Sequence, residues 1–144
     1  MSRIARSVFV FGIYLCVLGV MLVIAPNFLL TLFGLAPTND VWIRVLGTVV
    51  FWLGIFYVYA ARFELEPFFT ATVYARATEP LVLLTFVLLG WVGAPALLFG
   101  LLDLAGAVWT AAAMRQRAAE LVISSPGGDR NLPVAGKLEA GQRD

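Results

Sequence analysis

The sequence predicts an all-α integral membrane protein, a bundle of four transmembrane helices with both termini in the cytoplasm. Hydrophobic residues make up 61% of the 144 residues, and the mean hydropathy is +0.91. Such a composition is typical of membrane proteins. Four apolar segments can be drawn, and they cover residues 7–25, 41–61, about 71–92 and 95–114. They leave no room in the first 115 residues for a soluble domain.

The first span follows two basic residues, Arg3 and Arg6, as the start of a signal peptide would. However, the segment around Ala25 and Pro26 is not a small-residue cleavage site, and the apolar run is longer than that of a signal peptide. We therefore expect an uncleaved membrane anchor. Cys16 lies inside this span, where we expect a packing role because apolar surroundings suppress the reactive thiolate.

The second span is introduced by a loop, residues 26–40, whose first part is apolar enough to form a short helix at the membrane interface. Its last residues, Thr38 to Asp40, are suited to cap the next helix. Spans one and two each carry two glycines seven residues apart, which places each pair on one helix face. We interpret them as packing glycines that allow a close approach of two backbones. They are Gly12, Gly19, Gly47 and Gly54.

The third span is the most informative, because its purely apolar part, residues 81–92, is only twelve residues long. Twelve residues reach roughly 18 Å, whereas the hydrocarbon core is about 30 Å thick. The tight turn after residue 92 has no length to donate, so the helix must begin earlier and include Arg76 and Glu79. Ionisable residues inside a membrane are functional-site candidates by default.

The fourth span carries Asp103, about 12 Å below the outer face. A lone carboxylate is costly there, and Arg44 at the start of span two is the only cation on that side. We therefore predict a structural ion pair between Arg44 and Asp103, with a proton-relay or substrate carboxylate as the alternative. After span four, residues 115–120 should continue the helix into water. We expect a membrane domain over residues 1–123 and a disordered cytoplasmic tail over residues 124–144.

Basic residues indicate the orientation, because cytoplasmic loops carry an excess of Lys and Arg. They precede span one, follow span two and follow span four, which puts both termini and the middle loop in the cytoplasm. We expect an integral protein of a bacterial inner (cytoplasmic) membrane. The residues concerned are Arg3, Arg6, Arg62, Arg76, Arg115 and Arg117.

Four polar side chains from three spans fall at similar depths in the inner half of the membrane, roughly 18 to 26 Å from the outer loops. They are Tyr14, Tyr57, Arg76 and Glu79. If their faces converge, they line a ligand-binding pocket that opens to the cytoplasmic leaflet. The alternative is structural: Arg76 and Glu79 are three residues apart on one helix and can neutralise each other.

Several chemistries are excluded by composition. The chain has no histidine and one cysteine, so a single chain cannot form a bis-histidine haem, a histidine zinc site or a Ser-His-Asp triad. We assign no catalytic residue, no metal and no cofactor, and we expect no nucleic-acid partner. Whether the protein is an enzyme stays open, with a non-catalytic role favoured.

The second span carries a motif in which Arg44 stands before Leu46 and Gly47, followed by a second Leu-Gly pair at 53–54 and Ala-Ala-Arg at 60–62. With the layout of four short spans, this resembles the DoxX-like group of small four-helix membrane proteins over about residues 6–115. The resemblance implies the fold. Some members of that group look like small subunits of quinone-linked oxidoreductases, and others act as assembly factors.

The leading functional prediction is a non-catalytic accessory subunit or assembly factor of a larger membrane complex, with a membrane-protein partner or a homo-oligomer. Membrane lipids are expected contacts. The alternative is a membrane enzyme or carrier for a lipophilic small molecule, a quinone or a lipid, bound in the inner polar layer. Transport of the small multidrug type is disfavoured, because span one has no charged residue after Arg6.

Overall fold

A computed structural model describes residues 1–124 of the chain. In this part the fold is entirely helical, and four of the helices are long and apolar enough to cross a membrane. The elements are α1 (Arg3–Ile24), α2 (Pro26–Leu32), α3 (Val41–Arg62), α4 (Glu66–Leu88), the 3-10 helix η1 (Ala94–Ala96) and α5 (Leu97–Ser124). The predicted all-α fold with four membrane-length helices is confirmed.

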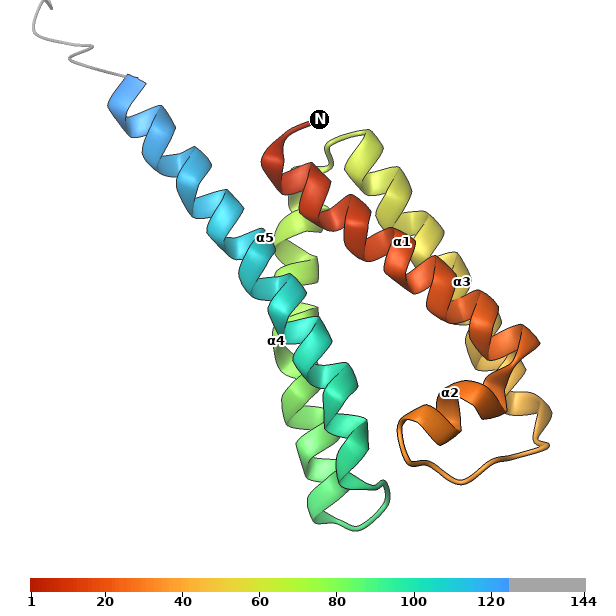
Figure 1. Ribbon diagram of the computed structural model, residues 1–144. Helices are drawn as coiled ribbons and strands as arrows, with labels where there is room; N and C mark the ends of the chain where they lie inside the picture. Colours follow the sequence, from red (N-terminus) through yellow and green to blue (C-terminus); the bar gives the residue numbers. More distant parts are fainter. Residues whose placement is uncertain (125–144) are drawn as a thin grey trace, which may run out of the picture.

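Helices α1 and α3 lie side by side along most of their length (Figure 1). The four predicted glycines lie in their interface, where a Cβ atom would meet backbone of the opposite helix. A Cβ on Gly19 would stand 2.5 Å from the Phe51 nitrogen, and one on Gly54 would stand 2.7 Å from the Cys16 nitrogen. The glycines therefore set how closely α1 and α3 approach, as small residues do between membrane helices.

The connection between α1 and α3 contains the short helix that the sequence predicts, α2, which starts with Pro26 at its first turn. The predicted cap of the following helix is formed only in part. Asp40 occupies the N-cap position of α3, but its side chain makes no capping hydrogen bond. Instead, its backbone N–H donates to the Thr38 hydroxyl at 3.1 Å.

Helix α4 begins at Glu66, fifteen residues before Leu81, and continues through Pro80. The prediction that span three starts early, with Arg76 and Glu79 in the helix, is confirmed. The helix ends earlier than expected, because α4 stops at Leu88 and Gly90 turns the chain with a φ of +71°. Helix α5 then packs along α4, and a Cβ on Gly100 would lie 2.9 Å from the Pro80 Cα.

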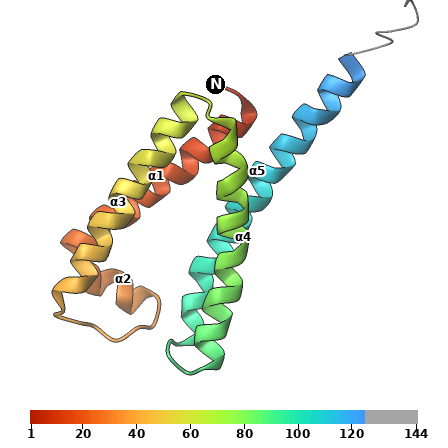
Figure 2. The same ribbon diagram turned by 180° about the vertical axis from the view of Figure 1, so that it is seen from behind.

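The two helix pairs, α1 with α3 and α4 with α5, meet mainly through α1 and α5. Figures 1 and 2 show the pairs in contact near the N-terminus and diverging toward the end that carries α2 and the α4–α5 connection. The first residue of the chain, the α3–α4 connection and the last turns of α5 lie at the same end. That arrangement is required of an even number of spans.

The α3–α4 connection is tied to the N-terminus by Glu64. Its carboxylate accepts a hydrogen bond from the Ser2 backbone N–H at 2.8 Å and lies 3.6 Å from the Met1 amino group. Glu64 has a φ of 50°, in the left-handed region that non-glycine residues rarely adopt. These contacts lower the pKa of Glu64, with the Ser2 N–H as the largest cause and the N-terminal charge as a further one.

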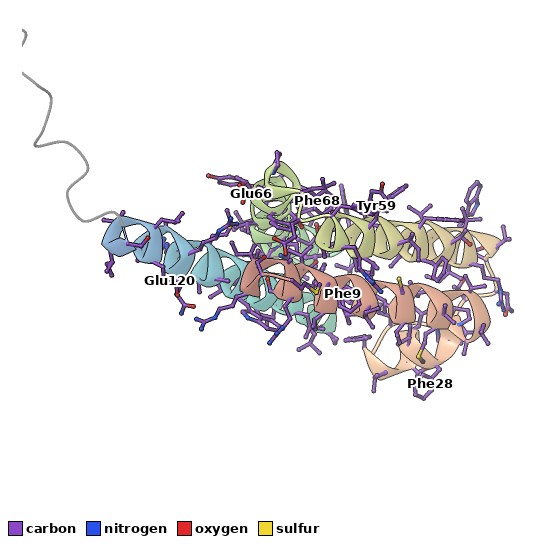
Figure 3. The ribbon with its side chains drawn as sticks, turned by 90° about the horizontal axis from the view of Figure 1, so that it is seen from above. Phe9, Phe28, Tyr59, Glu66, Phe68 and Glu120 are labelled. Carbon is purple, nitrogen blue, oxygen red and sulfur yellow. The ribbon has the colours of Figure 1, made fainter. Side chains whose placement is uncertain are left out.

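Helix α5 has 28 residues, which correspond to about 42 Å, more than a bilayer core of about 30 Å requires. The predicted helical extension after residue 114 is therefore present and reaches Ser124. Figure 3 shows the last turns, with Glu120, extending beyond the other helices. Of the predicted tail, residues 125–144 lie outside the described residues.

Candidate functional site

Arg76 lies at the junction of the two helix pairs, on the face of α4 that meets α5. Its side chain is almost completely buried, with 4% of its surface exposed. The Nη2 group donates to the Thr110 hydroxyl of α5 at 2.8 Å, and Nε donates to the Thr72 carbonyl at 3.4 Å. A buried guanidinium needs such acceptors, because an unpaired charge is costly away from water.

Aromatic rings from the other pair complete this environment. The Phe11 ring of α1 has its centroid 4.2 Å from the Arg76 Cζ atom, and the Tyr57 ring of α3 has its centroid at 5.9 Å. The hydroxyl groups of Tyr57 and Thr72 form a hydrogen bond between α3 and α4. Cation–π contacts gain strength when the cation is desolvated, as here. Arg76 thus contacts all three of the other long helices.

A second polar contact lies next to it. The Ser7 hydroxyl of α1 lies 3.0 Å from the Thr110 hydroxyl of α5, which also donates to the Gly106 carbonyl at 2.9 Å. Ser7 is 2% exposed and Thr110 is fully buried. Neither residue was predicted. A sequence signal existed, since each is the one Ser or Thr residue of its apolar segment, but a hydroxyl is a weaker signal than a charge. We call Ser7, Arg76 and Thr110 the polar junction.

One nitrogen of the polar junction has no partner. Arg76 Nη1 is buried and makes no hydrogen bond within residues 1–124. It lies beside Gly106 of α5, where an added Cβ would come within 2.7 Å of it and 3.1 Å of the Phe11 ring. Only a glycine leaves space here for the guanidinium and the ring together. The N–H groups of Nη1 can therefore take an acceptor that residues 1–124 do not supply.

The predicted layer of four polar residues is brought together only in part. Arg76 and Tyr57 face each other in the packed core, and Tyr14 joins them indirectly, because its ring packs on Phe11 with centroids 5.6 Å apart. Glu79 is half-buried on α4. It does not form the predicted ion pair with Arg76, whose guanidinium is directed to Thr110 instead.

The predicted Arg44–Asp103 ion pair is also not formed in this structure. The ion pairs of residues 1–124 join the N-terminus to Glu64 and Arg117 to Glu66. Arg44 donates to the Val23 carbonyl at the end of α1. The reason is lateral position: α3 packs on α1, whereas Asp103 is on α5, which packs on α4. Asp103 lies instead within electrostatic range of Arg76 and Glu79.

The cavity nearest to the polar junction lies between α1 and α5 and has a volume of about 220 Å³. Its lining is almost entirely apolar and includes Phe11, Tyr14 and Gly106. Of the four predicted ligand-binding residues, Tyr14 alone lines it. Phe11 and Gly106 also pack against Arg76, so the cavity and the unpartnered Nη1 share two neighbours. Among residues 1–124, no cluster of three Cys, Asp or Glu residues could hold a metal ion.

Comparison of the chain with protein-family models, with curated proteins and with solved structures gave no match. The resemblance to the DoxX-like group therefore stays a prediction.

Proposed function

We propose that this chain is a small, non-catalytic integral membrane protein that serves as an accessory subunit or assembly factor of a larger membrane complex. The observation that supports this role is the free end of α5. Starting from η1, about 20 helical residues suffice to cross the hydrocarbon core, so the last turns extend beyond it. Three consecutive residues there are 61% to 78% exposed: Leu121, Val122 and Ile123.

The arrangement of these three residues favours a protein partner over the membrane surface. Consecutive residues of a helix are about 100° apart, so the three side chains span about 200° of its circumference. A flat bilayer surface covers only one face of a helix, whereas a groove or a helical partner covers more. Exposed apolar groups of this kind mark interaction sites. Arg115 and Arg117 precede them and mark the boundary of the membrane.

Crosslinking tests this role directly. A photoreactive residue at position 122 should give one dominant crosslinked protein in native membranes, either a membrane-complex subunit or a second copy. The double substitution Leu121→Ser with Ile123→Ser should abolish that product, whereas Ala119→Ser with Glu120→Gln, on the same turns, should leave it unchanged. A chain that purifies alone in mild detergent and gives no crosslinked protein would contradict the proposal.

The orientation is part of the same proposal. We infer that both termini lie in the cytoplasm of a bacterial inner membrane, because the basic residues gather at the end that holds the N-terminus and the last turns of α5. On a background without Cys16, a cysteine at position 38 should be labelled from outside the cell. A cysteine at position 128 should be labelled only after permeabilisation. The reverse pattern would overturn this orientation.

A second candidate function is binding of a lipophilic molecule, a quinone or another carbonyl-containing lipid, at Arg76. The unpartnered Nη1 beside an apolar cavity favours it. Nη2 and Nε already have acceptors, so the free nitrogen suits a single carbonyl oxygen better than a carboxylate, which pairs best with two donors. Organic extraction of the purified protein followed by mass spectrometry should then recover one compound in stoichiometric amount. Recovery of bulk lipid alone would remove this candidate.

A further inference from the structure

Two neighbouring cavities lie between α1 and α5, and together we call them the α1–α5 groove. The apolar cavity described above shares Trp109 with a second cavity of about 280 Å³, which is lined by Arg3 and Arg6 of α1 and by Gln116 of α5. The second cavity lies at the end of the bundle that holds the N-terminus. The groove therefore has a polar, basic end and an apolar body.

The helical periodicity of both walls explains why the two cavities follow one another along the helices. On α5, Leu102, Trp109 and Gln116 are seven residues apart, which is two turns, so they form one row along the helix. On α1, Arg3, Arg6 and Val10 follow at intervals of three and four residues, which also lie on one face. Each row changes from polar to apolar in the same direction. The polar residues of α1 thus lie opposite the polar residue of α5, and the apolar residues of the two helices lie opposite each other.

The length of the groove corresponds to one leaflet. From Gln116 to Leu102 the fourteen residues span about 21 Å. Half of a hydrocarbon core of about 30 Å, together with one headgroup layer, amounts to about 20 to 22 Å. The basic end lies at the level of the lipid headgroups if the apolar body lies at the level of the acyl chains. This relation holds in whichever leaflet the N-terminus is placed.

The charge of the basic end is not balanced within the described chain. Arg3 and Arg6 are exposed, and neither takes part in the ion pairs of residues 1–124. Of the acidic residues at this end of the bundle, Glu64 and Glu66 are engaged by the N-terminus and by Arg117, and Glu120, one turn beyond Gln116, forms no ion pair with Arg3 or Arg6. Two guanidinium groups, a Gln amide and the Trp109 indole therefore offer donors that have no acceptor among residues 1–124. A phosphate group is the acceptor for which such donors are suited.

We propose that the α1–α5 groove binds one phospholipid with an anionic headgroup, with the phosphate at Arg3 and Arg6 and one acyl chain along Trp109, Val10 and Leu102. This site is independent of the protein partner proposed above, since that surface lies at the end of α5 beyond Arg117. The groove includes the apolar cavity beside Arg76, so a lipid in the groove and a lipophilic molecule at Arg76 would compete for the same space. A bound lipid would cover the α1–α5 interface, where the two helix pairs are joined.

Trp109 provides the measurement, because it lines both cavities. In a background where Trp42, Trp52 and Trp91 are changed to Phe, all of them exposed positions, the fluorescence of Trp109 is followed in phosphatidylcholine nanodiscs. A minor fraction of brominated phosphatidylglycerol should quench it more than the same fraction of brominated phosphatidylcholine. Each arginine near the membrane surface contributes about 1 kcal/mol to the binding of an anionic lipid. With two arginines, the preference for phosphatidylglycerol over phosphatidylcholine should be about tenfold or more. Equal quenching by the two lipids would overturn the proposal.

Matched variants separate a specific site from general attraction. Arg3→Gln with Arg6→Gln should abolish the preference for phosphatidylglycerol, whereas Arg62→Gln with Arg115→Gln, which removes the same charge outside the groove, should retain it. An equal loss in both double variants would reduce the effect to general electrostatics and refute the site. Ala105→Phe, which fills the apolar cavity, should also lower the preference, and a preference unchanged by it would refute the acyl-chain position. Circular dichroism confirms that each variant is folded.

Discussion

The substitution Gly19→Ala tests the close approach of α1 and α3. A Cβ at this position would stand 2.5 Å from the Phe51 nitrogen and 2.7 Å from the Gly47 oxygen. Ordinary contact begins at 3.4 Å, so the helices would have to separate locally by about 0.9 Å. Both obstructing atoms belong to the backbone, and no rotamer change relieves the clash.

The expected loss of stability in Gly19→Ala is the balance of two opposing effects. Overpacking of a well-packed interface costs about 1 to 3 kcal/mol, and rigid backbone atoms place this site near the upper end. Alanine in place of glycine gains up to about 1 kcal/mol of helix propensity. We therefore expect the free energy of unfolding to fall by about 2 kcal/mol, although a Gly-to-Ala change inside an isolated helix would raise it.

Equilibrium unfolding in mixed micelles, followed by circular dichroism, measures this change. Gly93→Ala is the matched control, because its Cβ would lie 3.4 Å from the Pro95 Cδ and meet no closer atom; we expect a change within about 0.5 kcal/mol. The double variant Gly19→Ala with Gly47→Ala should lose less stability than the sum of the two single variants, since one separation of α1 from α3 relieves both clashes. A Gly19→Ala protein as stable as the wild type would refute the close packing of α1 and α3.

Three further predictions concern the polar residues. Thr110→Val removes the acceptor for Arg76 and should lower the stability by about 1 to 2 kcal/mol, while Thr78→Val, an exposed position on α4, should have little effect by the same unfolding measurement. If the polar layer binds a ligand, Glu79→Gln should reduce the amount of lipophilic compound recovered while folded yield stays nearly intact; a parallel fall of yield and thermal stability would indicate a structural role. The pKa of Glu64 is lowered in the folded protein. Its carboxylate therefore stabilises the folded state above the ordinary glutamate pKa, and this stabilisation is lost as the pH falls through the lowered pKa. Thermal unfolding between about pH 6 and pH 3 should therefore show a steeper loss of stability in the wild type than in Glu64→Gln.

The extent of the helices could be predicted because it depends on quantities that the sequence states directly. Bilayer thickness and the rise per residue required span three to begin before Leu81, and α4 does begin at Glu66. The seven-residue spacing of the glycines likewise fixed the packing face of α1 and α3. Each argument concerns one helix at a time, and for such properties the apolar pattern is sufficient.

The neighbours of each helix could not be predicted in the same way. Counting residues from the loops gives the depth of a side chain but not its lateral position, so Arg44 and Asp103 were paired by depth although they belong to different helix pairs. Arg76 was assigned to Glu79 by spacing along one helix. Its actual partner, Thr110, became apparent only when α5 was placed against α4. Polar partners across helices depend on packing that no periodicity encodes.

The position of the polar junction accounts for the shape of the bundle and for where binding is proposed. Helices α1 and α3 are held together along their length by close contacts at four glycines, and α4 meets α5 closely at Gly100. The two pairs are joined mainly where Ser7, Arg76 and Thr110 meet. In hydrocarbon no water competes for such groups, so a few hydrogen bonds can fix one end of an interface. The pairs then diverge beyond it. The basic end of the proposed lipid groove lies on the joined side. A lipid headgroup bound there would meet helices already held in position, so less ordering entropy would be lost on binding.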